Sequence, residues 1–210
     1  MLIVGAKGFA KEVLEVLYKN NQTNNLCFFD NVNKDIGEYL FDKYPIIKSI
    51  SDAHTYIKNV NSEFTIGIGN PILRKRMYDM FDKIGGQFTS VISHNSEIGS
   101  YNVKIGEGCN ILPNVVISNG SVIGVGCLLY FNSIVTHDCS VGDFVELSPG
   151  ATLLGRVIVG NNSQIGANAT ILPDIRVGAN VVVGAGAVVT KDLPDNSIAV
   201  GVPAKVIKYS

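Results

Sequence analysis

Histidine is the first residue type to consider for chemistry, because its imidazole ring exchanges protons near neutral pH. Of the three histidines, His137 is the strongest candidate, because a carboxylate, Asp138, follows it directly. That carboxylate could orient the ring and stabilise its positive charge, which would suit a general base. A solvated histidine at a turn of the chain is the alternative interpretation. We expect His54 to be a surface residue and His94 to help cap a structural element.

Three short loops form a second candidate site, because each follows a predicted strand. They are Gly5–Gly8, Asp30–Asn31 and Gly69–Asn70. The carboxyl ends of strands in an open parallel sheet converge on one crevice, where ligands bind. Glycines in the first loop would let backbone N–H groups approach a phosphate, and Asp30 could accept hydrogen bonds from a ribose or a base. A purely structural role for these glycines remains the alternative.

The cysteines do not suggest a metal or redox site. Cys27, Cys109, Cys127 and Cys139 form no CxxC pair and have no histidines at ligand spacing. We expect them to be packing residues, and we predict no metal site.

The elements that position these residues differ between the two parts of the chain. Residues 1–90 hold 21 of the 35 charged residues but only 7 of the 22 glycines. In this part we predict a small Rossmann-like α/β domain with a parallel sheet. Its strands are expected at 2–5, 26–30 and 64–69, its helices at 10–20 and 71–84, and a further short strand and helix within 45–57. Because so short a domain cannot hold two mononucleotide halves, we expect it to bind a single nucleotide.

From residue 103 to residue 192 the sequence repeats every six residues. All fifteen hexads carry an aliphatic residue at their third position, and Ile92 and Ile98 add two further turns upstream. A period of six fits neither an α-helix nor a simple alternating strand, but it is typical of a hexapeptide β-helix. Three hexads form one coil, and the first and third positions of each hexad face the interior. Three of the cysteines fall on first positions, which explains them structurally.

A β-helix with three hexads per coil has the shape of a three-sided prism. Residues 18 apart therefore stack along one edge of this prism. His137 stacks with Asn119 on one side and with Gly155, Pro173 and Lys191 on the other. A base at one end of a groove and a cation further along would suit coenzyme A. Asp138 lies one coil from Arg156, so the carboxylate could orient His137 or pair with Arg156.

Charge and hydropathy exclude several classes of function. The formal net charge is −1 and the pI is about 6.3, so no basic field is available to bind nucleic acid. The first fifteen residues contain no secretory apolar region, and later apolar runs stop well short of the ~20 residues that span a bilayer. We therefore expect a cytoplasmic protein without membrane insertion.

These features together resemble one family over nearly the whole chain. It is the bacterial nucleotide-amino-sugar N-acetyltransferases, or sialic-acid O-acetyltransferase-like proteins, which are hexapeptide-repeat acyltransferases. The resemblance rests on the segments IVGAKGFAKEV, FFDN, IGIGNPILRKR, THDCSVGD, LSPGATLLGRVIVG and VGVPAKVIK. It implies a left-handed parallel β-helix, a homotrimer, acetyl-CoA as donor and a nucleotide-linked amino sugar as acceptor. The expected domains are 1–90 for the nucleotide sugar, 91–194 for the β-helix and 195–210 for a C-terminal tail.

The resemblance also assigns roles to residues. His137 is implied as the general base with support from Asp138. The implied contacts to the nucleotide sugar are Lys7, Gly8, Phe9, Asp30, Asn31 and Gly69, and those to the donor are Gly155, Ala167 and Ala185. Ala167 and Ala185 lie on a different prism edge from Gly155, as expected for a donor groove between two subunits of a trimer. Lys191 joins the expected donor site because of its place on the edge of His137.

The chain departs from the family at two of these positions. Phe9 stands where the first loop often carries a histidine, so that sugar contact is altered. Glu146 stands where many relatives carry a histidine near the acetyl group of the donor. We place Glu146 in the donor site, but its contact with the acyl group, and the length of that group, remain open.

The predicted reaction is direct transfer from acetyl-CoA to the amine of a nucleotide-linked 4-amino-4,6-dideoxy sugar within a ternary complex. No residue is expected to act as a covalent nucleophile, since Cys139 faces inward. The alternatives are O-acetylation of a sialic acid or sugar, a non-catalytic nucleotide-sugar-binding trimer, and a γ-type carbonic anhydrase. The last would need three histidine ligands for a metal, whereas His54 lies outside the repeats.

Overall fold

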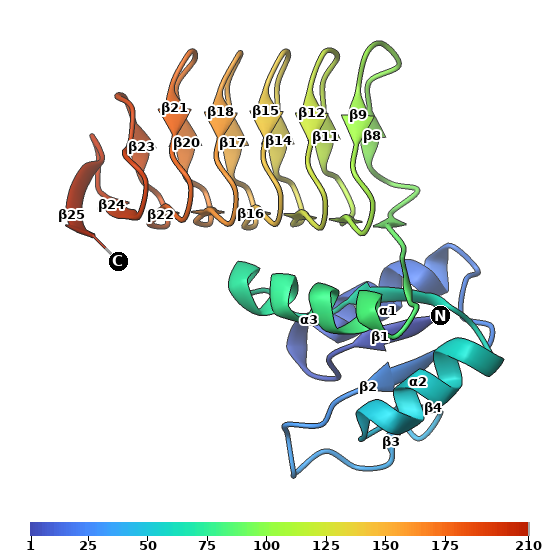
Figure 1. The fold of residues 1–210 in the computed structure, drawn as a ribbon. Helices are drawn as coiled ribbons and strands as arrows, with labels where there is room; N and C mark the ends of the chain where they lie inside the picture. Colours follow the sequence, from blue (N-terminus) through green and yellow to red (C-terminus); the bar gives the residue numbers. More distant parts are fainter. Residues whose placement is uncertain (210) are drawn as a thin grey trace. The chain divides into compact units, whose positions relative to one another are not determined.

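The computed structural model describes residues 1–209 and divides them into two compact units. The first unit is Met1–Val91 and the second begins at Ile92. Figure 1 shows the α/β character of the first unit and the regular stack of coils in the second. In the described chain no helix is both long enough and apolar enough to cross a membrane.

The first unit is built around a six-stranded sheet of order β3-β4-β2-β1-β5-β6. All neighbouring strands pair in parallel except β3 and β4, which form an antiparallel hairpin. The strands are β1 (Leu2–Val4), β2 (Cys27–Phe29), β3 (Tyr39–Leu40), β4 (Tyr44–Ile47), β5 (Glu63–Ile66) and β6 (Gln87–Phe88). The helices are α1 (Gly8–Lys19), α2 (Ile50–Asn59) and α3 (Pro71–Lys83).

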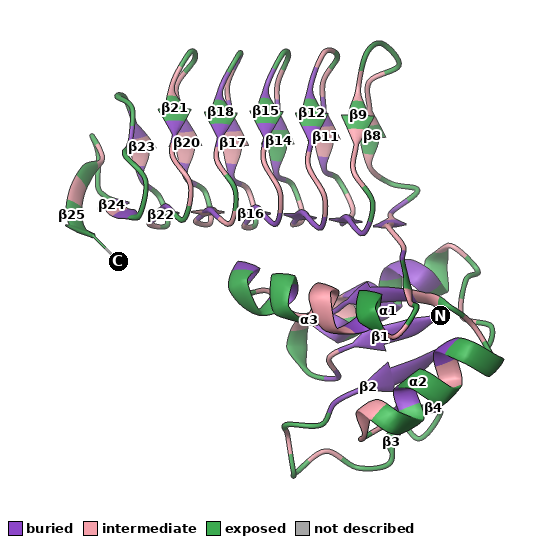
Figure 2. Cartoon of the chain, in the orientation of Figure 1, coloured by how far each residue is buried: buried purple, intermediate pink, exposed green. Residues whose placement is uncertain are grey.

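Local sequence explains these elements. Helix α1 buries one apolar stripe at helical spacing, which consists of Ala10, Val13, Leu14, Val16 and Leu17. Helix α3 begins at a proline, and the side chain of Asn70 caps it by accepting the N–H of Leu73. A Cβ atom at Gly67 would lie 2.6 Å from the Cβ of Ala10, so a glycine is needed where α1 packs against the end of β5. In Figure 2 the central strands are buried and the outer faces of the helices are exposed.

Most predicted elements of this unit are present. The expected strand 64–69 is shorter and ends at Ile66, because the chain leaves the sheet at Gly67. The edge strands β3 and β6 were not predicted, since two-residue strands show no periodicity.

The second unit is a left-handed parallel β-helix with three faces, as the repeat and the resemblance predicted. One face carries β7 (Val91–Ile92), β10 (Asn110–Ile111), β13 (Leu128–Leu129), β16 (Glu146–Leu147), β19 (Gln164–Ile165) and β22 (Val182–Val183). The next carries β8 (Glu97–Ile98), β11 (Val116–Ile117), β14 (Ile134–Val135), β17 (Thr152–Leu153), β20 (Thr170–Ile171) and β23 (Val188–Val189). The third carries β9 (Lys104–Ile105), β12 (Val122–Ile123), β15 (Ser140–Val141), β18 (Ile158–Val159) and β21 (Arg176–Val177).

The register of the β-helix follows the 18-residue period. Leu129 pairs with Leu147, and Leu147 pairs with Ile165. The first and third positions of the hexads form one continuous core, in which Cys109, Cys127 and Cys139 are buried as free thiols. The fold class is therefore the predicted one.

The sixth hexad position is the corner residue that fixes the geometry of the site. Asp138, Arg156 and Asp174 occupy this position on successive coils and all have φ between 60° and 64°. Asn and Asp adopt this left-handed conformation more readily than other non-glycine residues, so Arg156 is the unusual residue among these three corner positions.

The expected C-terminal tail contains two strands. β24 (Ser197–Val200) pairs in parallel with β22, and β25 (Lys205–Tyr209) pairs antiparallel with β24. The tail thus extends one face of the β-helix.

Candidate active site

His137 lies at the corner between β14 and β15, and its side chain is 55% exposed. Its Nδ1 atom lies 2.8 Å from Oδ2 of Asp138. An ionised carboxylate can only accept hydrogen bonds, so this contact places the ring proton on Nδ1. Within residues 1–209 Nε2 makes no hydrogen bond, and its lone pair is therefore available to accept a proton.

Gly155 lies directly against the ring of His137. A Cβ atom at this position would lie 2.7 Å from both Nε2 and Cε1, so any larger residue would displace the imidazole. The N–H of Gly155 donates no hydrogen bond within the described residues. The cause is Pro173 one coil further, which has no side-chain acceptor. At the corresponding place on another edge, the N–H of Val125 donates to Oδ1 of Asp143, at 2.8 Å.

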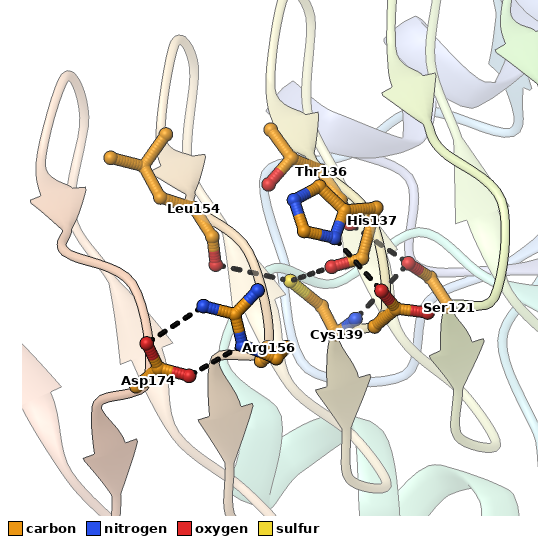
Figure 3. A network of polar contacts seen from close by, with 8 residues as sticks. Ser121, Thr136, His137, Cys139, Leu154, Arg156 and Asp174 are labelled. Carbon is orange, nitrogen blue, oxygen red and sulfur yellow. Dashed lines mark hydrogen bonds and ion pairs between the residues drawn. The ribbon is translucent and has the colours of Figure 1, made fainter.

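A buried serine holds the corner that carries His137. The hydroxyl of Ser121 donates to the carbonyl of Thr136 at 2.9 Å and accepts the N–H of Cys139 at 3.3 Å. The Cys139 thiol points inward and donates to the carbonyl of Leu154 at 3.3 Å (Figure 3). Burial raises the pKa of the Cys139 thiol, which further lowers its reactivity.

Arg156 does not pair with Asp138, although the sequence left that possibility open. Its Nε and Nη2 atoms donate to the two carboxylate oxygens of Asp174 at 2.5 and 2.8 Å. This bidentate hydrogen bond lowers the pKa of Asp174 and raises the pKa of Arg156. Figure 3 shows the guanidinium of Arg156 directed to Asp174.

A cavity of about 340 Å³ lies in the first unit, at the carboxyl ends of β1, β2 and β5. All six residues expected to contact a nucleotide sugar line it, namely Lys7, Gly8, Phe9, Asp30, Asn31 and Gly69. The three predicted loops therefore converge as the parallel sheet requires. Sequence reasoning missed the apolar wall of this cavity, which includes Leu73 and Met77 of α3.

The two glycines of the first loop have different structural roles. Gly5 has φ +107°, and a Cβ there would lie 2.9 Å from the carbonyl oxygen of Gly67, so the fold itself requires this glycine. Gly8 opens α1, and a Cβ there would meet no atom within 4 Å. Packing thus explains Gly5 but not Gly8.

The two charged residues of the cavity already have partners in the chain. Asp30 is buried, and its carboxylate accepts the N–H groups of Val32 and Asn33 and the Asn33 side-chain amide at 2.8–3.1 Å. These bonds shape the loop after β2. Lys7 lies 3.0 Å from Asp35 in an exposed ion pair, and its hydrogen bond lowers the pKa of Asp35. Such surface pairs are weak, so Lys7 can exchange this partner for a ligand.

Two family models match parts of the chain. Residues 1–81 match the family described as PglD N-terminal domain, and residues 156–191 match the family described as bacterial transferase hexapeptide (six repeats). A search of curated protein sequences gives no match.

Several solved structures resemble the whole chain. PerB from Caulobacter crescentus, in complex with CoA and GDP-perosamine, is 30% identical with a TM-score of 0.90, over 99% of this chain and 96% of that one. WeeI from Acinetobacter baumannii AYE is 30% identical with a TM-score of 0.89, over 98% of both chains. The acetyltransferase domain of PglB from Neisseria gonorrhoeae FA1090, in complex with acetyl coenzyme A, is 28% identical with a TM-score of 0.87, over 98% of both chains.

The chain belongs to the hexapeptide-repeat sugar N-acetyltransferases. It is an acyltransferase, and the resemblance stated from its sequence is confirmed.

The predicted donor residues of this acyltransferase lie on different parts of the prism. Ala167 and Ala185 occupy successive corners after β19 and β22, whereas Gly155 lies on the edge of His137. In the described chain the N–H groups of both alanines donate to no acceptor. Lys191 is exposed. The 18-residue register that would stack it on His137 ends just before it, because Val189 pairs with Ile171 but Leu193 pairs with Val177.

Glu146 lies on a flat face of this acyltransferase rather than at a corner. It is 8% exposed, and its carboxylate accepts hydrogen bonds from Ser148 at 3.1 Å and from Gln164 at 2.7 Å. These two donors fix its orientation.

The other histidines, His54 and His94, are exposed. Among residues 1–209 no group of three or more His, Cys, Asp or Glu side chains could hold a metal ion.

Proposed function

We propose that this acyltransferase transfers an acetyl group from acetyl-CoA to the amine of a nucleotide-linked 4-amino-4,6-dideoxy sugar. The observation that carries the proposal is the exposed His137, whose Nδ1 is hydrogen-bonded to Asp138 while Nε2 has no partner within residues 1–209. The similar structures of PerB, with CoA and GDP-perosamine, and of PglB, with acetyl coenzyme A, support the two substrate classes.

The nucleotide part of the acceptor is assigned to the cavity of the first unit. Its phosphates would lie at the start of α1, because the N-terminus of a helix and its dipole favour anions. Gly8 supports this assignment, because the open space beside it leaves the backbone accessible. Lys7 would add a positive charge once it leaves Asp35. Phe9 and Asn31, on opposite loops, would contact the base or the sugar.

The proposed chemistry is direct transfer with His137 as general base. The acceptor amine attacks the thioester carbonyl carbon, and Nε2 of His137 takes the proton that the amine loses. The C–S bond then breaks as the amide forms, and the same proton passes to the leaving thiolate of coenzyme A. Asp138 stabilises the transient imidazolium through Nδ1. The free N–H of Gly155 is the candidate to stabilise the oxyanion.

We propose a homotrimer in which the donor groove runs between two subunits. Gly155 lies on one edge of the prism, and Ala167 and Ala185 lie on another, which is the arrangement expected if an extended donor lies between two subunits. The free N–H groups of the alanines would bind carbonyl groups of the donor, and Lys191 would attract its phosphates. Glu146 is proposed to border the acyl end of the groove.

Release of coenzyme A thiol tests the reaction. The assay contains acetyl-CoA with UDP-, dTDP- and GDP-linked 4-amino-4,6-dideoxy sugars, free sialic acid, and a blank without acceptor. We expect rapid release with one nucleotide amino sugar, which would also identify the base. Release with sialic acid alone would replace the proposal with O-acetylation, and silence across the panel would contradict acetyl transfer to these acceptors.

The variant His137→Ala tests the role of the histidine. Because general-base assistance contributes about 10²–10⁴-fold, we expect a loss of that size in kcat/KM in a folded protein. His54→Ala is the matched control, since His54 is exposed in the first unit and outside the cavity. Full activity of His137→Ala would remove His137 from the mechanism.

A further inference from the structure

Three charged residues form a row beside His137. Asp138, Arg156 and Asp174 lie on successive coils, 18 residues apart, and share the same left-handed backbone conformation. The period therefore places one carboxylate on the coil before Arg156 and one on the coil after it. By register alone, the guanidinium could pair with either.

The structure selects one of the two pairings. Arg156 makes both of its side-chain hydrogen bonds to Asp174, in the bidentate form that is the strongest for this pair of groups. The carboxylate of Asp138 instead accepts a hydrogen bond from Nδ1–H of His137. The charge of Asp138 makes a smaller contribution to the raised pKa of Arg156, so the guanidinium is still within electrostatic reach of that carboxylate.

One further charged residue lies near this row in the described chain: Arg176, the outward residue of β21 on the coil of Asp174, which is exposed and forms no ion pair with Asp174. The outward residues of β14 and β15 are Ile134 and Ser140, and the coil above presents Thr152 and Ile158. The coil below presents Val116 and Val122, with Asn119 at the corner. Cys139 is buried with its thiol on backbone carbonyls. The charged corner residues beside the imidazole are therefore Asp138, Arg156 and Asp174.

We propose that Asp174 is a positioning residue for acetyl transfer, because it holds Arg156 away from Asp138 and so leaves the Asp138 carboxylate to His137. This inference rests on the proposed role of His137 as base. It assigns a function to a side chain that does not contact the ring and lies two coils away from Asp138.

Loss of Asp174 would change the proton position on His137. Arg156 would turn to Asp138, and the Nδ1–H···Oδ2 hydrogen bond would weaken. A neutral imidazole without that bond carries its proton on either nitrogen, and a ring with the proton on Nε2 cannot act as the base. The expected consequence is a lower kcat with little change in KM.

The first experiment needs no substrate and is therefore independent of the proposed reaction. The ¹⁵N shifts of the histidine rings are measured at about pH 9, where an ordinary histidine is neutral. His54 and His94 serve as internal references. We expect the wild-type ring of His137 to be protonated on Nδ1, and we expect Asp174→Asn to shift protonation towards Nε2. Asparagine suits the left-handed backbone, so this variant should fold.

A double variant separates the action of Arg156 from the mere loss of a charge. In Arg156→Asn/Asp174→Asn no guanidinium remains to capture Asp138, so Nδ1 protonation should return to the wild-type level. Asparagines already stack in this manner at Asn162 and Asn180, whose side chains bond at 3.2 Å. The conservative variant Asp174→Glu should behave as wild type.

Kinetics provide the second readout once an acceptor is known. We expect Asp174→Asn to lower kcat about two- to sixfold, the size expected when an exposed ion pair is rearranged, and the double variant to recover it. Asp79→Asn, which removes the carboxylate from the exposed pair with Lys75, is the matched control. An unchanged tautomer in Asp174→Asn, or a double variant as impaired as the single one, would overturn the inference. Absence of turnover in wild type would refute the proposed reaction and leave the NMR result valid.

Discussion

At the scale of single residues, the site depends on a glycine, Gly155, which has no side chain. Gly155 leaves the space into which the imidazole of His137 fits, and it leaves a backbone N–H beside Nε2. Asp138 fixes the opposite edge of the ring. The ring is thus oriented by a hydrogen bond on one nitrogen and by the shape of the neighbouring coil at the other.

The variant Gly155→Ala tests this arrangement. Its new Cβ would lie 2.7 Å from the ring, so the imidazole must rotate or shift. A displacement of about 1 Å can cost about 100-fold in rate, and we expect kcat/KM to fall by about 10- to 100-fold. Gly155 has no left-handed φ, so the melting temperature should change little.

Gly37→Ala is the control for that measurement. A Cβ at Gly37 would have only ordinary contacts, at 3.9 Å or more, and Gly37 lies outside the cavity. Wild-type kcat/KM in Gly155→Ala would show that the position of the ring does not matter for transfer.

At the scale of the element, each hexad is a two-residue strand and a corner. The strand alternates one residue outward and one inward, and the inward residues of all coils make a single column of contacts. Stability should therefore depend strongly on the third hexad position, and weakly on the second wherever that residue is exposed.

Leu147→Ala and Val182→Ala compare these two positions. Leu147 is fully buried between Leu129 and Ile165, and its truncation leaves a cavity. We expect it to lower the free energy of unfolding by about 2–5 kcal/mol, as measured by urea denaturation. Val182 is 36% exposed, and its truncation should cost less than about 1 kcal/mol. Equal losses in the two variants would contradict the inward and outward assignment.

At the scale of the whole molecule, the two units have separate cores, and each carries its own candidate functional residues. The cavity belongs to the first unit and His137 to the second. Both cores contain free cysteines, which are all buried. Burial raises the pKa of Cys27 to about 11, so at pH 8 its thiol is almost entirely protonated and unreactive.

We therefore expect no fast thiol reaction of the native protein with a disulfide reagent at pH 8, and four reactive thiols after denaturation. The variant Val182→Cys is the positive control, because it places an exposed thiol on the same fold. This thiol should react with the reagent within seconds to minutes. A rapidly reacting thiol in the wild-type protein would show that one core opens. The reactivity of Cys27 should rise with pH as the pH approaches about 11, because only the thiolate attacks the reagent.

Much of this organisation was predictable from the sequence because it is periodic or local. The six-residue repeat determined which residues face the core, and the 18-residue period placed Gly155 beside His137. Three loops at the ends of predicted parallel strands identified the lining of the cavity. The short strands β3 and β6 and the strands of the tail were not predictable, since two-residue strands and a non-repeating tail show no pattern.

Other features were decided only by the tertiary structure. Asp138 and Asp174 each lie 18 residues from Arg156, so the period places one carboxylate on each side of the guanidinium. Which of them pairs with Arg156 depends on side-chain geometry across the coils. The same holds for Asp30, whose carboxylate bonds to its own loop, and for Leu73 and Met77, which meet the loops only when α3 packs on the sheet. A sequence determines which groups share an edge, but hydrogen bonds are directional and short, so their partners are fixed only when the coils are stacked.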